Sequence, residues 1–277
     1  MSFFRREEDF YEENLGRCLY LCWLSAKDIT LLKEGDNKIA LSRAWGHLKS
    51  QLTIYFDDST IPFESIISAC KKINLTANPR IWCCYAPYED LLVFNLWVLL
   101  FTPTTDGFVV PSDAWVVGRS LVHEFDHHVF CEEHGMIGKK AEGELEEFVK
   151  SRLTPMEKRA FSSEISFLEN CKRNVPDKTR RITKIRDVTW TANGNKIEKI
   201  EFSPVLGWQS RLNVIQDIDE TISRVSATLS SIQDGAQYRI QADDRNLKLN
   251  LRIAQALSLP VQFDEKLVDY PMVEIEM

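Results

Sequence analysis

Histidine is scarce in this chain, and four of its five copies crowd into twelve residues, at His123, His127, His128 and His134. Imidazole is a common metal ligand and acid–base group. The first part of the cluster reads His123-Glu124-Phe125-Asp126-His127, which is the pattern HExxH. These residue types at this spacing indicate hydrolysis assisted by a metal ion.

The spacing has a physical basis if the segment is helical. Positions i and i+4 then lie on one face, one turn apart, so both imidazoles can reach one ion at about 2.0 Å. Glu124 would lie beside the ion and could take a proton from a metal-bound water. The motif therefore predicts a Zn²⁺ site with His123 and His127 as ligands and Glu124 as the catalytic base.

A catalytic zinc ion needs a third protein ligand and one open position. Glu133 has the spacing of the third ligand in metzincins, but Phe130 stands where that arrangement needs a glycine. His134 would lie about 10 Å along the helix axis from His127, too far to share an ion. The turn from Gly135 to Gly138 would instead fold a second helix back, which leaves Glu142, Glu144, Glu146 and Glu147 as candidates.

The segment from His123 to Pro155 resembles the gluzincin metallopeptidases, and most of all the ImmA/IrrE-like group. In that group HExxH is followed by a helix of the type Glu-x-x-Ala-x-x-Phe-Ala that ends in Leu-x-Pro. Aligning Phe148, Leu153 and Pro155 with this pattern makes Glu142 the third ligand, whereas a thermolysin-like spacing selects Glu146 or Glu147. Asp126, His128 and Leu145 depart from the family pattern.

The resemblance implies a zinc metallopeptidase that binds an extended peptide along an edge strand. Residues 108–110 or 80–85 would supply that edge. A tyrosine or histidine that assists the developing oxyanion is also implied, and Tyr85, Tyr88, Tyr238 and Tyr270 all remain open.

Hydrophobic periodicity and turn residues predict an α+β fold, with an HExxH helix beside a small sheet in a zincin-like domain. The first 75 residues are predicted to be mainly helical, and the remainder is predicted to be mixed. Predicted helices cover residues 38–52, 62–73, 112–134, 140–153, 155–171, 208–232 and 244–257. Predicted strands cover 80–85, 108–110, the hairpin 181–202, 261–263 and 272–275. The apolar run 91–102 fits either a strand or a core helix.

A basic stretch from Lys172 to Arg181 suggests a boundary between a metallopeptidase domain, residues 1–172, and a smaller C-terminal αβ module, residues 173–277. The net charge of −7 argues against nucleic acid as a partner, and the longest apolar run is too short to span a membrane. Seven cysteines without zinc-knuckle spacing, and the lack of a signal peptide, predict a reduced cytoplasmic protein.

Two other functions fit the sequence. One is a non-catalytic regulatory or interaction protein with a structural or degenerate metal site. The other is a carboxylate-bridged diiron protein, because Glu124-x-x-His127 is also an ExxH, but the sequence has no second ExxH.

Overall fold

The computed structural model describes residues 9–69, 73–138, 144–194, 196–260 and 270–275, with side chains from residue 14 in the first helix and from residue 151 in the sixth. The helices are α1 (Asp9–Asp28), the 3₁₀ helix η1 (Ile29–Lys33), α2 (Gly35–Tyr55), α3 (Phe63–Ala69), α4 (Leu96–Leu100), α5 (Ala114–Glu133), α6 (Glu144–Asn174), α7 (Arg211–Ser231) and α8 (Gly235–Ala256). The strands are β1 (Ile73–Thr76), β2 (Cys83–Ala86), β3 (Leu91–Asn95), β4 (Phe101–Pro103), β5 (Val109–Pro111), β6 (Lys178–Asn193), β7 (Lys196–Ser210) and β8 (Met272–Ile275). The α+β prediction is confirmed.

Two four-stranded sheets have the orders β2-β3-β1-β8 and β4-β5-β6-β7. In the first sheet β1 and β3 are parallel, and both outer pairs are antiparallel; the second sheet is antiparallel throughout. Strand β2 is therefore an edge, whereas β5 has a neighbour on each side. Of the two segments predicted to offer an edge for a peptide, only the one that contains β2 has that position.

The apolar run from Leu91 to Thr102 forms neither one strand nor one helix. It divides into β3, the single-turn helix α4 and the start of β4. The Asn95 side chain caps α4 by accepting a hydrogen bond from the Trp97 N–H at 2.8 Å. The Asn95 amide also donates to the Asn78 carbonyl at 2.8 Å. This buried asparagine thus marks the point where the strand ends and the helix begins.

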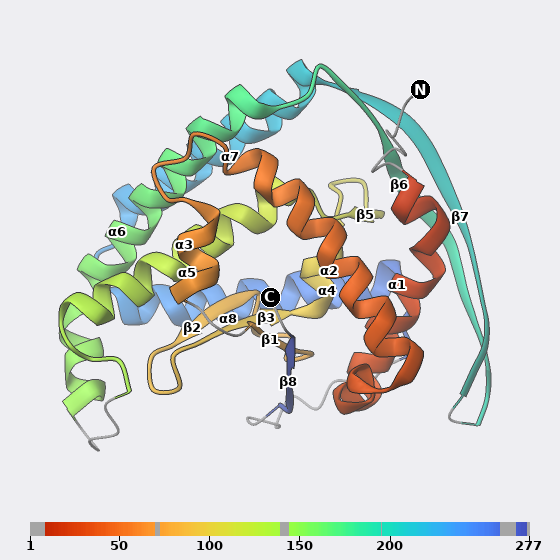
Figure 1. Ribbon diagram of the computed structural model, residues 1–277, viewed down its shortest axis with the longest axis horizontal. Helices are drawn as coiled ribbons and strands as arrows, with labels where there is room; N and C mark the ends of the chain where they lie inside the picture. The colour runs from red at the N-terminus through yellow and green to blue at the C-terminus, as the bar shows by residue number, and fades with distance from the viewer. Residues whose placement is uncertain (1–8, 70–72, 139–143, 195, 261–269, 276–277) are drawn as a thin grey trace.

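Helices α5 and α6 pack antiparallel and carry the HExxH residues and their neighbours (Figure 1). Helix α5 matches the predicted helix, and Gly135 ends it with a φ of 64° that favours glycine. The prediction of two helices divided at Pro155 is wrong, because α6 continues through this proline. A proline within a helix costs about 3 kcal/mol. Buried Leu153 and Met156 pack on either side of it and hold the helix together.

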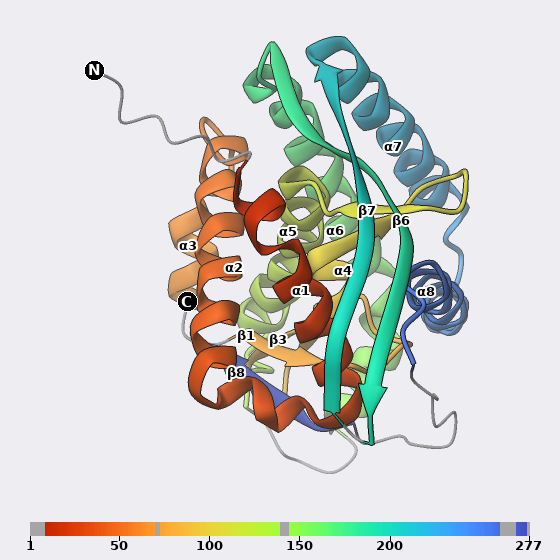
Figure 2. The same ribbon diagram turned by 90° about the vertical axis from the view of Figure 1, so that its right-hand side faces the viewer.

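The predicted hairpin is confirmed and is longer than expected. Strands β6 and β7 run along one side of the molecule past α1, and Gly194 in their turn has a φ of 59° (Figure 2). The helix predicted to reach Ile73 is shorter, because Ile73 begins β1 and packs in the core. Strand β8 has the predicted bounds, and the predicted strand 261–263 lies outside the described residues.

Strands from both sides of residue 172 pair with each other: β5 with β6, and β1 with β8. The division into domains 1–172 and 173–277 stays a prediction, but the two parts share both sheets. No helix in the described part of the chain is long and apolar enough to cross a membrane.

The packing of α5 on α6 gives a direct test of the fold. A Cβ added at Gly118 of α5 would lie 2.6 Å from Cζ of Phe167 on α6, and Phe167 is 2 % exposed. We expect Gly118→Ala to lower the free energy of unfolding by about 1–3 kcal/mol in urea titrations, because the core has no room for the methyl group.

The matched control is Gly46→Ala in α2, where nothing lies within 4 Å of the added Cβ. This substitution should raise stability by about 0.5–1 kcal/mol, because glycine is a poor helix former. Equal effects of the two substitutions would contradict the close α5–α6 packing.

Candidate metal centre

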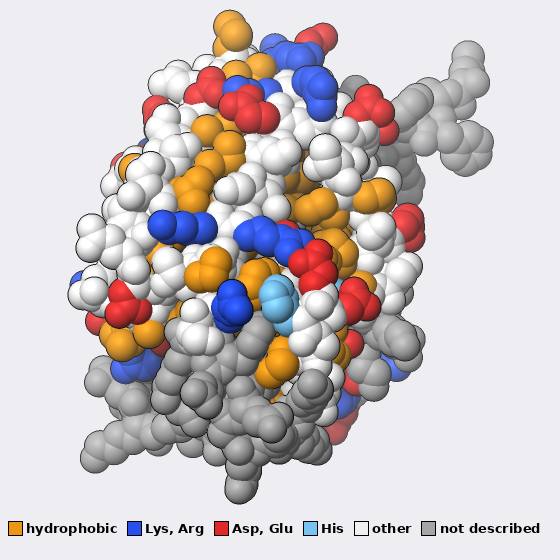
Figure 3. Space-filling model, turned by 90° about the vertical axis from the view of Figure 1, so that its left-hand side faces the viewer, with side chains coloured by type: hydrophobic (Ala, Val, Ile, Leu, Met, Phe, Trp, Pro, Cys, Tyr) orange, Lys and Arg blue, Asp and Glu red, His pale blue; other side chains and the backbone are white. Residues whose placement is uncertain are grey.

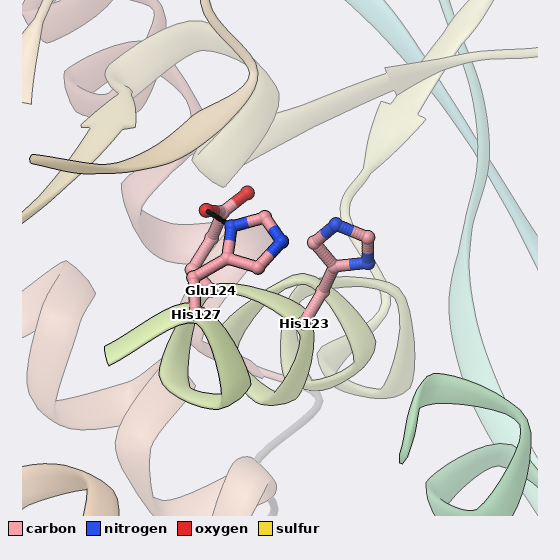
Figure 4. A group of neighbouring side chains, drawn as sticks. All are labelled: His123, Glu124 and His127. Carbon is pink, nitrogen blue, oxygen red and sulfur yellow. Dashed lines mark ion pairs between the residues drawn. The ribbon is translucent and has the colours of Figure 1, made fainter. Parts of the chain in front are cut away.

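The HExxH residues share one buried region of α5. His123 and His127 rise from the same face of the helix with their rings 4.8 Å apart between centroids, and Glu124 lies on the far side of the His127 ring (Figure 4). One possible ligand atom from each of the three residues lies within 4.8 Å of the other two. The sequence therefore identified residues that the fold brings together.

A carboxylate from α6 joins this group. Oε2 of Glu157 lies 3.3 Å from Nε2 of His123 and 3.7 Å from Nε2 of His127. Atoms bound to one zinc ion in a tetrahedral arrangement, at about 2.0–2.2 Å, lie about 3.3–3.6 Å apart. The two distances from Glu157 are thus close to those between ligands of one zinc ion.

Burial adds a second reason to expect an ion. The side chains of Glu157, His127 and His123 are only 3 %, 4 % and 12 % exposed. Nε2 of His127 is buried and has no hydrogen-bond partner among the described residues. A buried polar atom without a partner is costly, and a bound cation at this point would remove that cost.

The outer nitrogen of each imidazole faces a carboxylate. Nδ1 of His123 lies 3.3 Å from Oε2 of Glu164, and Nδ1 of His127 lies 3.3 Å from Oε2 of Glu124. Carboxylates in this position fix the orientation of metal-binding histidines and make them more basic. Arg119 donates to Oε1 of Glu164 at 2.7 Å, so that carboxylate is itself held in place.

Helix α8 reaches the same site from the C-terminal part of the chain. Nε of Arg239 donates to Oε1 of Glu157 at 2.9 Å, which leaves Oε2 facing the histidines. The first residue of α8 also docks on α6, since the Gly235 N–H donates to Oγ1 of Thr154 at 3.0 Å. Thus α5, α6 and α8 together position the ligands.

The ionisation of the site reflects these contacts. Burial alone would lower the pKa of His123, but hydrogen bonds to Glu157 and Glu164 outweigh it and raise the pKa to about 10. Burial would raise the pKa of Glu157, but the hydrogen bond to His123 and the charges of His127, His123 and Arg239 lower it to about 2. Without a metal ion, a proton on His123 therefore balances the buried carboxylates.

The other predicted site residues have other partners. Oδ1 of Asp126 accepts from Arg159 at 3.2 Å and from Ser163 at 3.2 Å, so it ties α5 to α6. His128 lies 2.9 Å from Oδ1 of Asp90, and Nδ1 of His134 donates to the Phe130 carbonyl at 2.7 Å. Glu142 lies outside the described residues, as do the side chains of Glu144, Glu146 and Glu147. Glu142 therefore stays a prediction.

The tyrosines that could assist an oxyanion differ in their surroundings. The Tyr85 hydroxyl donates to Asp90 at 2.8 Å, and Tyr88 is 40 % exposed. Tyr238 packs on Phe161, whose ring in turn contacts His123. Burial raises the pKa of Tyr238 to about 12. These contacts favour Tyr238 as the tyrosine on the imidazole side of the site.

Sequence reasoning missed Glu157, Glu164, Arg119 and Arg239. A signal for the two glutamates exists, because they stand seven residues apart on the buried face of α6, near Ala160 and Phe161. The face of the molecule on the left of Figure 1 mixes basic, acidic and hydrophobic side chains (Figure 3).

Comparison of the chain with protein families, with curated proteins and with solved structures finds no match.

Metal analysis distinguishes the two possible third ligands. We expect the protein to bind one zinc ion, and His123→Ala to lose it. Glu157→Gln should weaken zinc binding at least tenfold, because an amide is a poor replacement for a carboxylate ligand, whereas Glu142→Gln should bind zinc as the wild type does. Competition with a chromophoric chelator measures the affinities. The reverse pattern would favour Glu142 and contradict Glu157.

Chelator-treated protein should lose stability as the pH rises from 6.5 towards 10. The pKa of His123 in the folded protein, about 10, exceeds the unfolded value of about 6.5, so its proton stabilises the fold fully below pH 6.5 and not above pH 10. Urea unfolding at several pH values should show the wild type losing its advantage over His123→Gln across this range. A constant difference between the two proteins would contradict the prediction.

Proposed function

We propose that this protein is a zinc-dependent metallopeptidase with a zincin-like centre, in which His123, His127 and Glu157 hold the ion and Glu124 is the general base. The observation that carries the proposal is the convergence of both Nε2 atoms on the buried Glu157 carboxylate. Three protein ligands leave one position open, as catalytic zinc sites do. The free thiols of the described cysteines support the expectation that it acts in the cytoplasm.

Zinc, when bound, would polarise a water molecule and the carbonyl group of the peptide. Glu124 takes a proton from the water as its oxygen bonds to the carbonyl carbon. Glu124 then gives this proton to the departing nitrogen as the C–N bond breaks, so the products are a carboxylic acid and an amine.

Glu124 has to turn for this role. Its Oε2 accepts from the Tyr85 N–H at 2.8 Å and lies 3.3 Å from Nδ1 of His127, on the side of the ring away from His123. Catalytic groups are often misaligned before substrate binds, so this position is compatible with a base. It also gives Glu124 a second duty, which is to orient His127.

The position of β2 supports a peptide as the substrate. This strand is an edge of its sheet and lies beside α5, close enough for its backbone to bond Glu124. A peptide can add to such an edge through main-chain hydrogen bonds, which require no particular side chains. Tyr238 is the tyrosine best placed to donate to a developing oxyanion, given its contact with Phe161.

Glu124→Gln tests the proposal and separates the two duties of Glu124. If Glu124 is the base, the variant should keep one zinc ion with an affinity within tenfold of the wild type and lose at least 100-fold in the rate of peptide cleavage. Cleavage of a fluorogenic peptide library and zinc titration provide the measurements. Glu133→Gln, which changes an exposed carboxylate near the end of the same helix, is the control and should keep both zinc and cleavage.

Two results would contradict the proposal. One is a zinc-loaded wild type that cleaves no peptide in the library. The other is a Glu124→Gln variant with full activity. A variant that loses zinc, and with it turnover, would assign Glu124 to orienting His127 instead.

A further inference from the structure

Arg239 has hydrogen-bonding groups that the metal centre does not use. Its Nε atom donates to Glu157, and within the described part of the chain no partner is recorded for its two terminal nitrogens. The side chain is 42 % exposed, although the carboxylate that it holds is 3 % exposed. The guanidinium therefore joins the buried site to the solvent.

The same side chain lies near the edge strand. Burial and the charge of Glu124 raise the pKa of Cys84 in β2 to about 12, and the guanidinium of Arg239 counteracts this rise. Helix α8 also contacts the residues just before β2, since Asn246 donates to the Arg80 carbonyl, and Arg239 of this helix contacts the proposed ligand Glu157. Asp243, one turn further along α8, also influences Cys84, but no ion pair between Asp243 and Arg239 is recorded among the described residues.

The helix that carries Arg239 is held in place by its neighbours. Its helix docks on α6 through Gly235, where an added Cβ would lie 2.8 Å from the Leu153 carbonyl carbon. Tyr238 packs on Phe161, and Asn246 of the same helix donates to the Arg80 carbonyl at 3.1 Å, just before β2. Docking of the helix and the hydrogen bond from Nε to Glu157 together restrict where the guanidinium can lie.

Two adjacent N–H groups of a guanidinium match the two oxygens of a carboxylate, which is a planar, bidentate interaction. A peptide carries one carboxylate that does not depend on its sequence, at its C-terminus. We propose that the terminal nitrogens of Arg239 bind the C-terminal carboxylate of the substrate, so that this site removes residues from free C-terminal ends. This inference rests on the proposed peptidase function and narrows its substrate class.

Binding to zinc-free protein tests the inference without turnover. Calorimetry should show that an N-acetylated tripeptide with a free carboxylate binds at least tenfold more tightly than the same tripeptide amide, because a charge-assisted pair is lost with the amide. Arg239→Gln should remove this preference. Arg252→Gln is the matched control, since Arg252 is on the same helix and donates to the Thr104 carbonyl. Equal binding of acid and amide to the wild type would overturn the inference.

Cleavage by zinc-loaded protein provides the second test. An N-acetylated decapeptide should be shortened from its free C-terminus at least tenfold faster than its amide, as followed by mass spectrometry. Arg239→Lys should retain part of this preference, because lysine keeps the charge without the bidentate geometry. Zinc content is measured for each variant, so that loss of the ion is not mistaken for loss of substrate recognition.

The outcomes keep the two proposals apart. Internal cleavage of acid and amide at equal rates would leave a metallopeptidase and overturn the role of Arg239. If zinc-loaded protein cleaves neither peptide, the proposed function fails, and the binding preference and its loss in Arg239→Gln still decide whether Arg239 recognises a carboxylate.

Discussion

The structure around α5 and α6 depends on the burial of carboxylates. The side chains of Glu157 and Glu164 are 3 % and 6 % exposed, and removing an ionised carboxylate from water costs several kcal/mol even after the protein has relaxed. Such a charge is retained only where positive charge and hydrogen bonds meet it. Arg119, Arg239 and His123 supply them, and each reaches its carboxylate to within hydrogen-bond distance. This requirement fixes how three helices pack.

The chain meets this requirement through a few close contacts between segments that are distant in the sequence. The close approach of Gly118 to Phe167 lets α5 lie against α6. About two turns further along α5, Asp126 locks the same pair of helices through Arg159 and Ser163. On the opposite side, the Tyr85 N–H fixes Glu124 relative to the sheet. The polar site is therefore enclosed by apolar contacts and oriented by polar ones, which is what a preorganised metal centre needs.

The sequence predicted the site residues that lie close together in the chain, but not those that only tertiary packing brings to the site. HExxH, the bounds of α5 and the hairpin follow from spacing, a glycine stop and an Asn-Gly turn, all of which act over a few residues. Sequence reasoning missed Glu157 because the predicted helix break at Pro155 separates it from the glutamates that follow the turn after α5. In the structure the helix continues, since packing of Leu153 and Met156 outweighs the cost of the proline. The better clue was two glutamates on a buried helical face, because charges there require partners. Arg239 had no local signal, since its role depends on how α8 docks.

Charge balance connects the metal centre to the C-terminal part of the chain. Glu124, Glu157 and Glu164 bring three carboxylates together, while Arg119 and Arg239 bring two permanent positive charges. A proton on His123 or a metal cation has to supply the rest, so the two compete for the same place and binding of one releases the other. Without Arg239 the site would lack one more positive charge, and Glu157 would be free to turn away from the histidines. Residues 1–172 therefore hold the proposed ligands but not the full set of charges, and any boundary near residue 172 must leave α8 seated on α6.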